Sequence, residues 1–349
     1  MKIRLAIVEN DEEYAEKLIG ALINKYSDKI EVSRFTDLDA AVNALSDLNI
    51  DVLLAVPNLV DSLTTIPKRC GFGYLVSGSG VSKYEGQPAV CKYQKTELLY
   101  KQILDIYAES SKSVVRPEPV HGETRLILFS SPCGGTGTSS AAAGCSIRFA
   151  AEGRKTLYFN LEQFGSSNPF FSSDGQFGLS DLIFALKRKN SNISMKLESC
   201  VRKSAENVYF YAPVTVAPER FELTASEIRV LLETLQTTGE YHDIIVDMDF
   251  RVEKEFLQNW DLFSSVIWVL DGSSIAHEKA LRALEYLTVG NEHRFLDRIQ
   301  ILFNKCEPGS QNQIGLDNLK ILGTLPNLNH SVSSQIAIGL SMNKLFDSI

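Results

Sequence analysis

The chain has 349 residues, of which 44% are hydrophobic and 22% are charged, and its formal net charge is −8. At roughly 150 residues per domain, this length predicts two domains, each with its own core. The acidic balance, without a long basic run, argues against a dedicated nucleic-acid surface. Six scattered cysteines form no CxxC pair, which argues against a zinc site.

Hydrophobic runs in the sequence are short. None approaches the roughly eighteen apolar residues that a membrane span requires, and the apolar run at the N-terminus is too short for a signal peptide. We therefore expect a cytoplasmic chain without a transmembrane segment.

Residues 1–110 alternate between apolar strands and amphipathic helices. Strands are expected at 3–8, 31–35, 52–56, 73–76 and 89–92, and helices at 11–25, 38–48 and 96–108. Asn10 followed by Glu13 resembles a capping box at the start of the first helix. Five strands with intervening helices predict a doubly wound parallel sheet. The crossovers at 57–72 and 77–86 are rich in Pro, Gly and Ser, so one face of this sheet is expected to be thin.

This first domain resembles the receiver domains of two-component response regulators. Those domains place acidic residues after the first strand, a phosphoacceptor Asp after the third, a hydroxyl after the fourth and a Lys after the fifth. Here Glu9 and Asp11 approximate the acidic set, Ser77 matches the hydroxyl and Lys92 the Lys, but Val56 ends the third strand. The resemblance implies a degenerate receiver domain that accepts no phosphate. Glu9 and Asp11 are interpreted as a solvated helix start rather than a metal site.

Residues 111–123 are polar, contain two prolines and are interpreted as a linker. From residue 124 to 349 the alternation resumes. Strands are expected at 126–130, 156–161, 208–212, 243–247, 265–270, 299–304 and 321–325, and helices at 139–151, 179–189, 193–203, 224–235, 252–260, 276–287 and 332–346. The fold class is therefore α/β, with two doubly wound parallel-sheet domains.

The stretch LILFSSPCGGTGTSS, residues 126–140, joins an apolar strand to a small-residue helix through a Gly-rich turn. This order is the P-loop arrangement, in which backbone N–H groups and a helix N-terminus bind phosphate. The glycines are expected to supply positive φ and close approach. The expected nucleotide-binding residues are Cys133, Gly134, Gly135, Thr136, Gly137, Thr138, Ser139 and Ser140. The alternative is an ordinary Gly-rich turn between a strand and a helix.

The P-loop hydroxyl and the residue before it predict the chemistry. Ser139 stands where a hydroxyl ligates Mg²⁺, but Thr138 stands where the standard motif has the Lys that reaches the β and γ phosphates. We therefore expect ATP and Mg²⁺ to bind with slow or absent hydrolysis, because charge on the transferred phosphoryl group lacks that stabilisation.

Three polar side chains follow expected strands. Asp247 is assigned as a Mg²⁺ ligand, with a helix N-cap as the alternative. Glu162 is the candidate catalytic residue, orienting water or acting as an outer metal ligand, and a solvated loop carboxylate is the alternative. Asn304 carries an amide that can pair with an adenine edge, or it is a turn residue.

Together these motifs resemble the deviant Walker A family, which includes ParA, MinD and the nitrogenase iron protein. The matching positions are residues 133–139 for the loop, Asn160 and Glu162 for the switch, Asp247 for the strand-end carboxylate, Asn304 for adenine recognition and Pro326 after the last strand. Both family lysines are lost, at Cys133 and Thr138, so the family's dimerisation mode does not carry over directly.

A receiver-like domain before such a domain resembles the TadZ/CpaE family of tight-adherence pilus systems, as do the stretches SSPCGGTGTSS, NLEQFG and LESC. The resemblance implies a nucleotide-binding homodimer that helps place the pilus machinery at the cell pole, near the inner face of the membrane. The receiver-like domain would bind other pilus-assembly proteins, and a peripheral association with a membrane complex fits this role.

Other functions fit the sequence less well. The alternative to an assembly factor is an active ParA/MinD-type ATPase that cycles on DNA or membrane, against which the lost lysines and the acidic balance both count. A phosphorelay output protein is disfavoured by Val56. Redox sensing by Cys133 is a minor alternative. An iron–sulfur cluster is disfavoured because Cys145 and Cys200 fall in expected helices.

Overall fold

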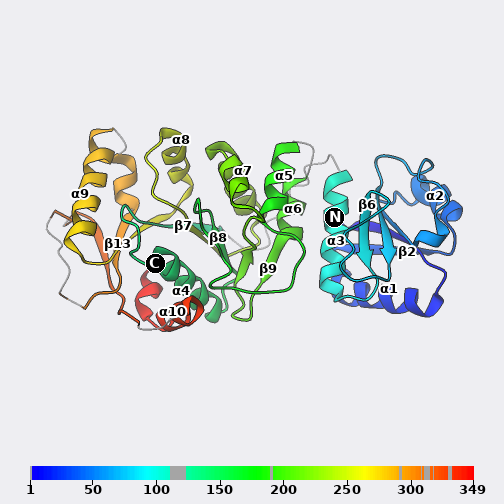
Figure 1. Cartoon of the computed structure of the whole chain (residues 1–349), viewed down its shortest axis with the longest axis horizontal. Helices are drawn as coiled ribbons and strands as arrows, with labels where there is room; N and C mark the ends of the chain where they lie inside the picture. Colours follow the sequence, from blue (N-terminus) through cyan, green and yellow to red (C-terminus); the bar gives the residue numbers. More distant parts are fainter. Residues whose placement is uncertain are drawn as a thin grey trace. The chain divides into compact units, whose positions relative to one another are not determined.

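A computed structural model of the chain describes residues 2–110, 123–188, 192–290, 293–307, 309, 315–316, 318–328 and 332–349. These residues form two compact units (Figure 1). Unit 1 comprises the described residues within Met1–Pro117 and Phe184–Cys200, and unit 2 those within Glu118–Ile183 and Val201–Ile349. The expected linker lies outside the described residues except for Glu123, so the division at 110 and 124 stays a prediction.

Unit 1 contains a six-stranded sheet. Its elements are β1 (Ile3–Val8), α1 (Glu12–Tyr26), β2 (Ile30–Phe35), α2 (Leu38–Asp47), β3 (Val52–Ala55), the 3-10 turn η1 (Pro57–Leu59), β4 (Gly71–Val76), β5 (Lys83–Tyr84), β6 (Gln87–Cys91) and α3 (Thr96–Ser110). The strand order is β2-β1-β3-β4-β6-β5. All neighbouring strands are parallel except β5, which pairs with β6 in the antiparallel sense at the edge. The expected doubly wound receiver-like sheet is thus confirmed.

Helices cover both faces of this sheet. In Figure 1, α1 and α3 lie on one side of the strands and α2 on the other. Leu22 of α1 and Ile103 of α3 pack with Leu5 in one cluster, whereas Leu45 of α2 packs with Ala6 in another. Neighbouring residues of β1 therefore face opposite cores, as the pleat of a strand requires.

The local details of unit 1 differ from the expected ones in two places. The N-cap of α1 is Asp11 and not Asn10, because the Asp11 carboxylate accepts a hydrogen bond of 3.0 Å from the N–H of Tyr14. The crossovers after β3 and β4 contain a 3-10 turn and the β5 hairpin but no α-helix among their described residues, which confirms the expected thin face.

Unit 1 also includes a segment from the second half of the sequence. Helix α5 (Leu179–Arg188) crosses the boundary between the units, and α6 (Ile193–Cys200) packs against α3. Lys196 of α6 forms a buried ion pair with Asp105 of α3. The sequence predicts the amphipathic helix but not the core it joins. The expected helix at 193–203 ends at Cys200, where a strand begins.

Unit 2 contains an eight-stranded sheet. Its further elements are β7 (Arg125–Ser130), α4 (Thr138–Ala151), β8 (Thr156–Asn160), β9 (Val201–Lys203), β10 (Tyr209–Tyr211), η2 (Ala217–Glu222), α7 (Ala225–Thr238), β11 (Asp243–Asp247), α8 (Lys254–Leu257), η3 (Gln258–Leu262), β12 (Ser265–Leu270), α9 (Ser274–Val289), η4 (His293–Arg298), β13 (Ile299–Phe303), β14 (Lys320–Thr324), α10 (Ser333–Ser341) and η5 (Lys344–Ser348). The strand order is β14-β13-β12-β7-β11-β8-β10-β9, and only β9 runs antiparallel to its neighbour.

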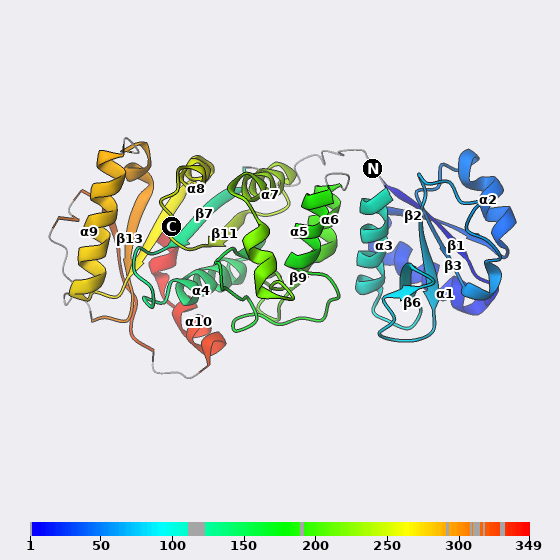
Figure 2. The ribbon, with the colours of Figure 1, turned by 45° about the horizontal axis from the view of Figure 1, so that its top comes forward.

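Helices lie on both faces of this second sheet as well. Figure 2 shows α4 and α10 on one side of the strands and α7, α8 and α9 on the other. Small residues of α4, with Ala141 in contact with the core and Gly144 beside Leu340, let α10 pack closely against it. The expected helices at 252–260 and 332–346 are each an α-helix followed by a 3-10 turn. None of the described helices is long and apolar enough to cross a membrane.

Candidate functional site

Polar side chains gather at the carboxyl ends of the central strands of unit 2. Strand β11 lies between β7 and β8, and its last residue, Asp247, is in register with Phe129 on one side and Asn160 on the other. The loop after β7 and the residues after β8 therefore open at the same edge of the sheet. Ligands of open α/β sheets bind at such edges.

The loop after β7 has the backbone that a phosphate-binding turn requires. Gly135 and Gly137 have φ of 82° and 87°, in the left-handed region that favours glycine. A Cβ on Gly137 would lie 2.4 Å from Nδ2 of Asn304, so both conformation and space demand glycine there. Gly134 has no positive φ, and the expectation that it supplies one is wrong.

Helix α4 begins without a side-chain cap. Its N-cap is Gly137, which makes no side-chain hydrogen bond to the helix. Thr138, Ser139 and Ser140 form the first turn, where N–H groups have no acceptor within the helix. The N-terminus of α4 therefore presents uncompensated N–H groups and the positive end of the helix dipole to the loop.

Contacts from neighbouring strands hold this loop by its carbonyl oxygens. Nδ2 of Asn304 donates to the main-chain oxygen of Thr136 at 2.8 Å, and Nζ of Lys305 donates to that of Gly135 at 2.7 Å. Asn304 is buried and lies against the loop. Its role in adenine recognition stays a prediction. Lys305 was not predicted. Its position directly after Asn304 places it at the same strand end, but its contact with Gly135 depends on how distant segments pack.

Behind the loop, four of the predicted side chains meet. Oγ of Ser139 donates to Oε2 of Glu162 at 3.0 Å. Nδ2 of Asn160 donates to the same Glu162 oxygen at 3.1 Å and to Oδ2 of Asp247 at 2.9 Å. The hydroxyl of Tyr158 also donates to Oδ2 of Asp247, at 2.7 Å. Tyr158 was not predicted, and its place two residues before Asn160 on the same face of β8 is the signal that was available.

The electrostatics of this cluster favour a cation. Asp247 is fully buried, and its Oδ1 has no hydrogen-bond partner among the residues that the structure describes. Burial, followed by the nearby Glu162 charge, raises the pKa of Asp247 to about 8. Burial and then Asp247 also raise the pKa of Tyr158 well above its usual range. A positive charge would relieve this cost, and carboxylate and hydroxyl oxygens are the ligands that Mg²⁺ prefers.

These residues fit a nucleotide-bound magnesium ion better than a free one. Within the described part of the chain, no group of three or more His, Cys, Asp or Glu side chains is arranged to hold a metal. Ser139 and Asp247 would hold the ion only together with phosphate oxygens and water, as is usual for Mg²⁺. The orphaned Asp247 oxygen and the uncapped helix α4 therefore point to one shared ligand.

The remaining predicted residues are less directly involved. Cys133 is buried, and its thiol lies 3.6 Å from the main-chain oxygen of Gly134. Thr136 Oγ1 lies 3.2 Å from Oγ1 of Thr138, at the position of the missing Lys. Pro326 follows β14 and is exposed, and no described hydrogen bond of the P-loop residues involves it. Its assignment to the nucleotide stays a prediction.

The corresponding edge of unit 1 is closed. Glu9 is 1% exposed and forms an ion pair with Lys92, so its interpretation as a solvated helix start is wrong. Its Oε1 also accepts from the N–H of Asp11 at 3.0 Å. The hydroxyl of Tyr14 donates to the main-chain oxygen of Lys92 at 3.1 Å, and Val56 is buried at the end of β3. Lys92 thus occupies the place of the receiver lysine but already has an internal partner.

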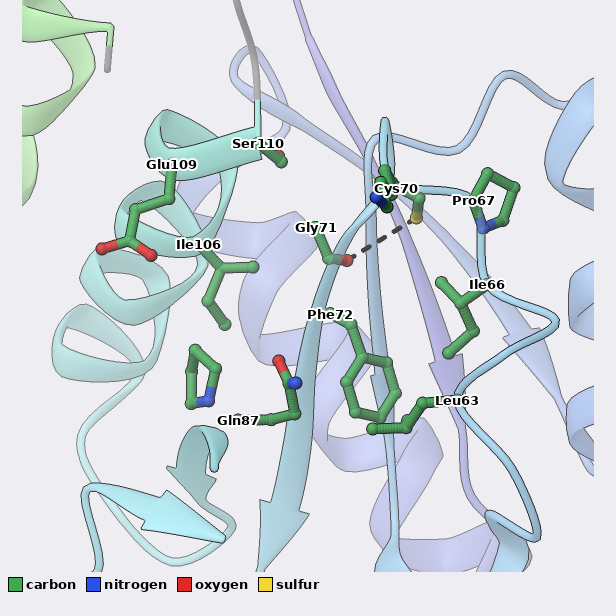
Figure 3. A pocket seen from close by; sticks show the side chains of 12 residues that line it. Leu63, Ile66, Pro67, Cys70, Gly71, Phe72, Gln87, Ile106, Glu109 and Ser110 are labelled. Atoms are coloured by element: carbon green, nitrogen blue, oxygen red, sulfur yellow. Dashed lines mark hydrogen bonds between the residues drawn. The ribbon is translucent and has the colours of Figure 1, made fainter. Parts of the chain in front are cut away.

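A pocket of about 340 Å³ opens elsewhere on unit 1. Figure 3 shows it at the start of β4, with Phe72, Leu63 and Ile66 on one side and Ile106 of α3 on the other. Because parallel strands start at the same edge, this pocket lies at the edge opposite Glu9 and Lys92. None of its lining residues was predicted as a site residue.

Comparisons with known proteins agree with both units. Residues 1–108 match the family model of the TadZ-like receiver domain. A ParA family ATPase from Chlorobium tepidum TLS superposes with a TM-score of 0.50 at 18% identity, covering 63% of this chain and 92% of that one. The septum site-determining protein MinD from Pyrococcus horikoshii OT3, solved with Mg-ADP, gives a TM-score of 0.48 at 18% identity, covering 62% and 94%. No curated protein matches the chain.

The fold and the site define an α/β protein in which a receiver-like unit precedes a unit that has the fold of a ParA family ATPase. Residues 1–108 are similar to TadZ-like receiver domains, and the arrangement of the two units is the one that the sequence resemblance implies.

Proposed function

We propose that this chain is an ATP-binding assembly and polar-localisation factor of a tight-adherence pilus system, in which nucleotide supports a homodimer and is hydrolysed slowly or not at all. The observation that carries the proposal is the uncapped N-terminus of α4, which adjoins the unpartnered Oδ1 of buried Asp247. One site lacks an anion and a cation at once, and a magnesium-bound nucleotide supplies both.

The residues divide the binding task. The N–H groups at residues 135–140 would bind phosphate oxygens, and Ser139 and Asp247 would hold the metal. Magnesium, when bound, would neutralise phosphate charge and fix the phosphate geometry. Glu162 accepts hydrogen bonds from Ser139 and Asn160, so its position would respond when Ser139 binds the metal.

Slow hydrolysis follows from the charges that the loop lacks. Thr138 presents a hydroxyl where a Lys would reach the β and γ phosphates, and removal of such a cation costs the transition state more than the ground state. Lys305 binds a loop carbonyl and so stabilises the loop itself. ATP then acts as a bound ligand, which at a hundredfold excess over Kd stabilises the binding-competent form by about 2.7 kcal/mol without turnover.

Unit 1 is proposed as the surface for other pilus-assembly proteins. Its phosphoryl site is filled by the Glu9–Lys92 ion pair, so signalling through an aspartyl phosphate is not available to it. The family match of residues 1–108 and the pocket beside Phe72 support a binding role instead. A position at the cell pole, near the inner face of the membrane, belongs to the same proposal.

The test combines binding, assembly and turnover on one preparation. Calorimetry with ATP and Mg²⁺ should show saturable binding, sedimentation should show a nucleotide-dependent dimer, and phosphate release should stay near background. Absence of any heat of binding would refute the proposal. Brisk turnover stimulated by DNA or liposomes would favour the ParA/MinD-type cycling ATPase instead.

A single substitution isolates the missing lysine. Thr138→Lys restores the standard motif at a half-buried position of α4, and we expect tighter ATP binding, by about tenfold, because one charge-assisted contact is gained. Phosphate release should rise above that of the wild type. Ala151→Lys, which adds the same charge at the exposed C-terminal end of α4, is the matched control and should change neither quantity.

A further inference from the structure

Arg220 is a buried cation without a carboxylate partner. It lies in η2 and is 4% exposed. Its Nη2 donates to the main-chain oxygen of Leu161, while its buried Nε has no hydrogen-bond partner within the described ranges. It forms no ion pair with any described residue, and the charge of Asp249 acts on it without direct contact. Burial lowers the pKa of Arg220 to about 10, so the side chain stays charged at neutral pH. A buried charge of this kind is costly, which suggests a partner that arrives in another state of the protein.

The candidate partner lines the same pocket. Arg220 shares a small pocket with Asn160, Glu162 and the loop around Ser166, and of the described residues lining it only Glu162 and Arg220 are charged. Glu162 instead accepts hydrogen bonds from Ser139 and Asn160. The carboxylate therefore has two neutral partners at present and an unpaired guanidinium across the pocket.

We propose that Arg220 is a positioning residue that receives the Glu162 carboxylate when the third phosphate of a bound nucleotide approaches Ser139. The inference rests on the proposed function. A γ-phosphate brings negative charge next to Glu162, and like charges in a buried site repel strongly. Moving toward Arg220 relieves this repulsion and gives the free Nε a charge-assisted hydrogen bond. A diphosphate brings less charge to that place and leaves Glu162 on Ser139.

A movement of Glu162 toward Arg220 would also affect exposed residues of unit 2. Phe164 follows Glu162 by two residues, Phe221 follows Arg220, and their rings meet edge to face at 5.2 Å between centroids. Both rings are exposed, at 82% and 52%. Pairing of Glu162 with Arg220 would therefore hold this exposed aromatic pair in one arrangement. The surface of unit 2 would then differ between the ATP-bound and the ADP-bound chain.

The experiment is a double-mutant cycle on the full chain, measured as binding. Arg220→Gln should weaken Mg-ATP about tenfold or more while changing Mg-ADP less than about twofold. In a Glu162→Gln background the same change should leave Mg-ATP binding unaltered, because the repelled charge is gone. Arg229→Gln, which removes an ion-paired surface arginine of α7, is the matched control and should change neither affinity.

Three outcomes overturn the inference: unchanged Mg-ATP binding in Arg220→Gln, equal weakening of ATP and ADP, or the same weakening with and without Glu162. Tryptophan fluorescence during urea unfolding checks the fold, since Trp260 and Trp268 are both buried in unit 2. If Arg220→Gln does not fold, the cycle is run with Arg220→Lys. We then expect a smaller loss of affinity, seen for Mg-ATP but not for Mg-ADP, and only in the chain that keeps Glu162. A wild type that binds no ATP refutes the proposed function and this inference with it.

Discussion

The two units carry equivalent edges of similar parallel sheets, and the two edges differ in how their charges are satisfied. In unit 1 the buried Glu9 is paired with Lys92, and Val56 replaces an acceptor carboxylate. In unit 2 the buried Asp247 keeps an oxygen without a partner beside an uncapped helix. Buried charges are normally paired, so the edge whose carboxylate has no counter-charge is the one suited to bind a cation. The two edges thus contrast an internal charge pair with a site that is open to a ligand.

The largest effect is expected from a substitution that blocks the P-loop at the open edge of unit 2. Gly137→Ala forces a Cβ to 2.4 Å from Nδ2 of Asn304 at a φ of 87°, so we expect the loop to shift. ATP affinity should fall about a thousandfold, equivalent to roughly 4 kcal/mol, and unit 2 should lose about 2 kcal/mol of stability. Calorimetry and urea unfolding followed by tryptophan fluorescence measure the two effects.

Gly134→Ala is the control for that substitution. An added Cβ there meets no atom within 4 Å, and the backbone has no positive φ. Its unfolding midpoint should match the wild type. If Gly137→Ala bound ATP as the wild type does, the assignment of the loop to phosphate would be wrong.

Opening the closed edge should cost stability without touching nucleotide binding. Lys92→Met leaves Glu9 buried and unpaired, which should lower the free energy of unfolding of unit 1 by about 3 kcal/mol. The double variant with Glu9→Leu should recover most of that loss, because no buried charge remains. Far-UV circular dichroism should show an earlier first transition, while the tryptophan signal from unit 2 stays in place. A parallel loss of ATP binding would contradict the independence of the two edges.

The open edge should also show in the pH dependence of stability. The pKa of Asp247 is about 8 in the folded chain, far above the unfolded value of about 3.9. The folded state therefore binds the proton more tightly, so this contribution is full below about pH 4 and is lost as the pH rises toward 8. Without Mg²⁺ and nucleotide, Asp247→Asn should unfold at higher urea than the wild type at pH 8, by about 1 to 2 kcal/mol.

The difference between the two proteins should shrink as the pH falls. Below about pH 4 the Asp247 carboxyl is protonated in both the folded and the unfolded wild type, so the two stabilities should converge there. Asp61→Asn removes an exposed carboxylate of unit 1 and should leave the pH profile of the tryptophan signal unchanged. A wild-type profile that is flat from pH 5 to pH 8 would show that Asp247 is already ionised without a metal.

The sequence predicts those residues of the site that lie in the P-loop or at the carboxyl end of a strand. Ser139, Glu162 and Asp247 were assigned to a nucleotide site from their places at strand ends and the P-loop, and Asn160 from the family resemblance. Their contacts are confirmed by the structure, whereas their roles toward a nucleotide stay predictions.

Residues that act through tertiary contacts were not predicted. The reach of Lys305 to Gly135 and that of Arg220 to Leu161 each depend on how far-separated segments pack, which no local pattern records. Glu9 was misinterpreted for a related reason. An acidic residue before a helix fits a solvated start as well as a buried ion pair, and only the position of Lys92 decides between them.

The smallest expected effect is no effect. Incubating the wild-type chain with acetyl phosphate and Mg²⁺ should add no phosphoryl group to unit 1, because Val56 offers no nucleophilic oxygen and Lys92 is already neutralised by Glu9. Intact mass spectrometry measures this directly, with a phosphorylatable receiver domain as the positive control. A hydroxylamine-labile phosphoryl group on a residue of unit 1 would mean that the Glu9–Lys92 ion pair opens in solution. The closed edge would then be a working phosphoryl site, and the contrast with unit 2 would no longer separate a structural charge pair from a ligand site.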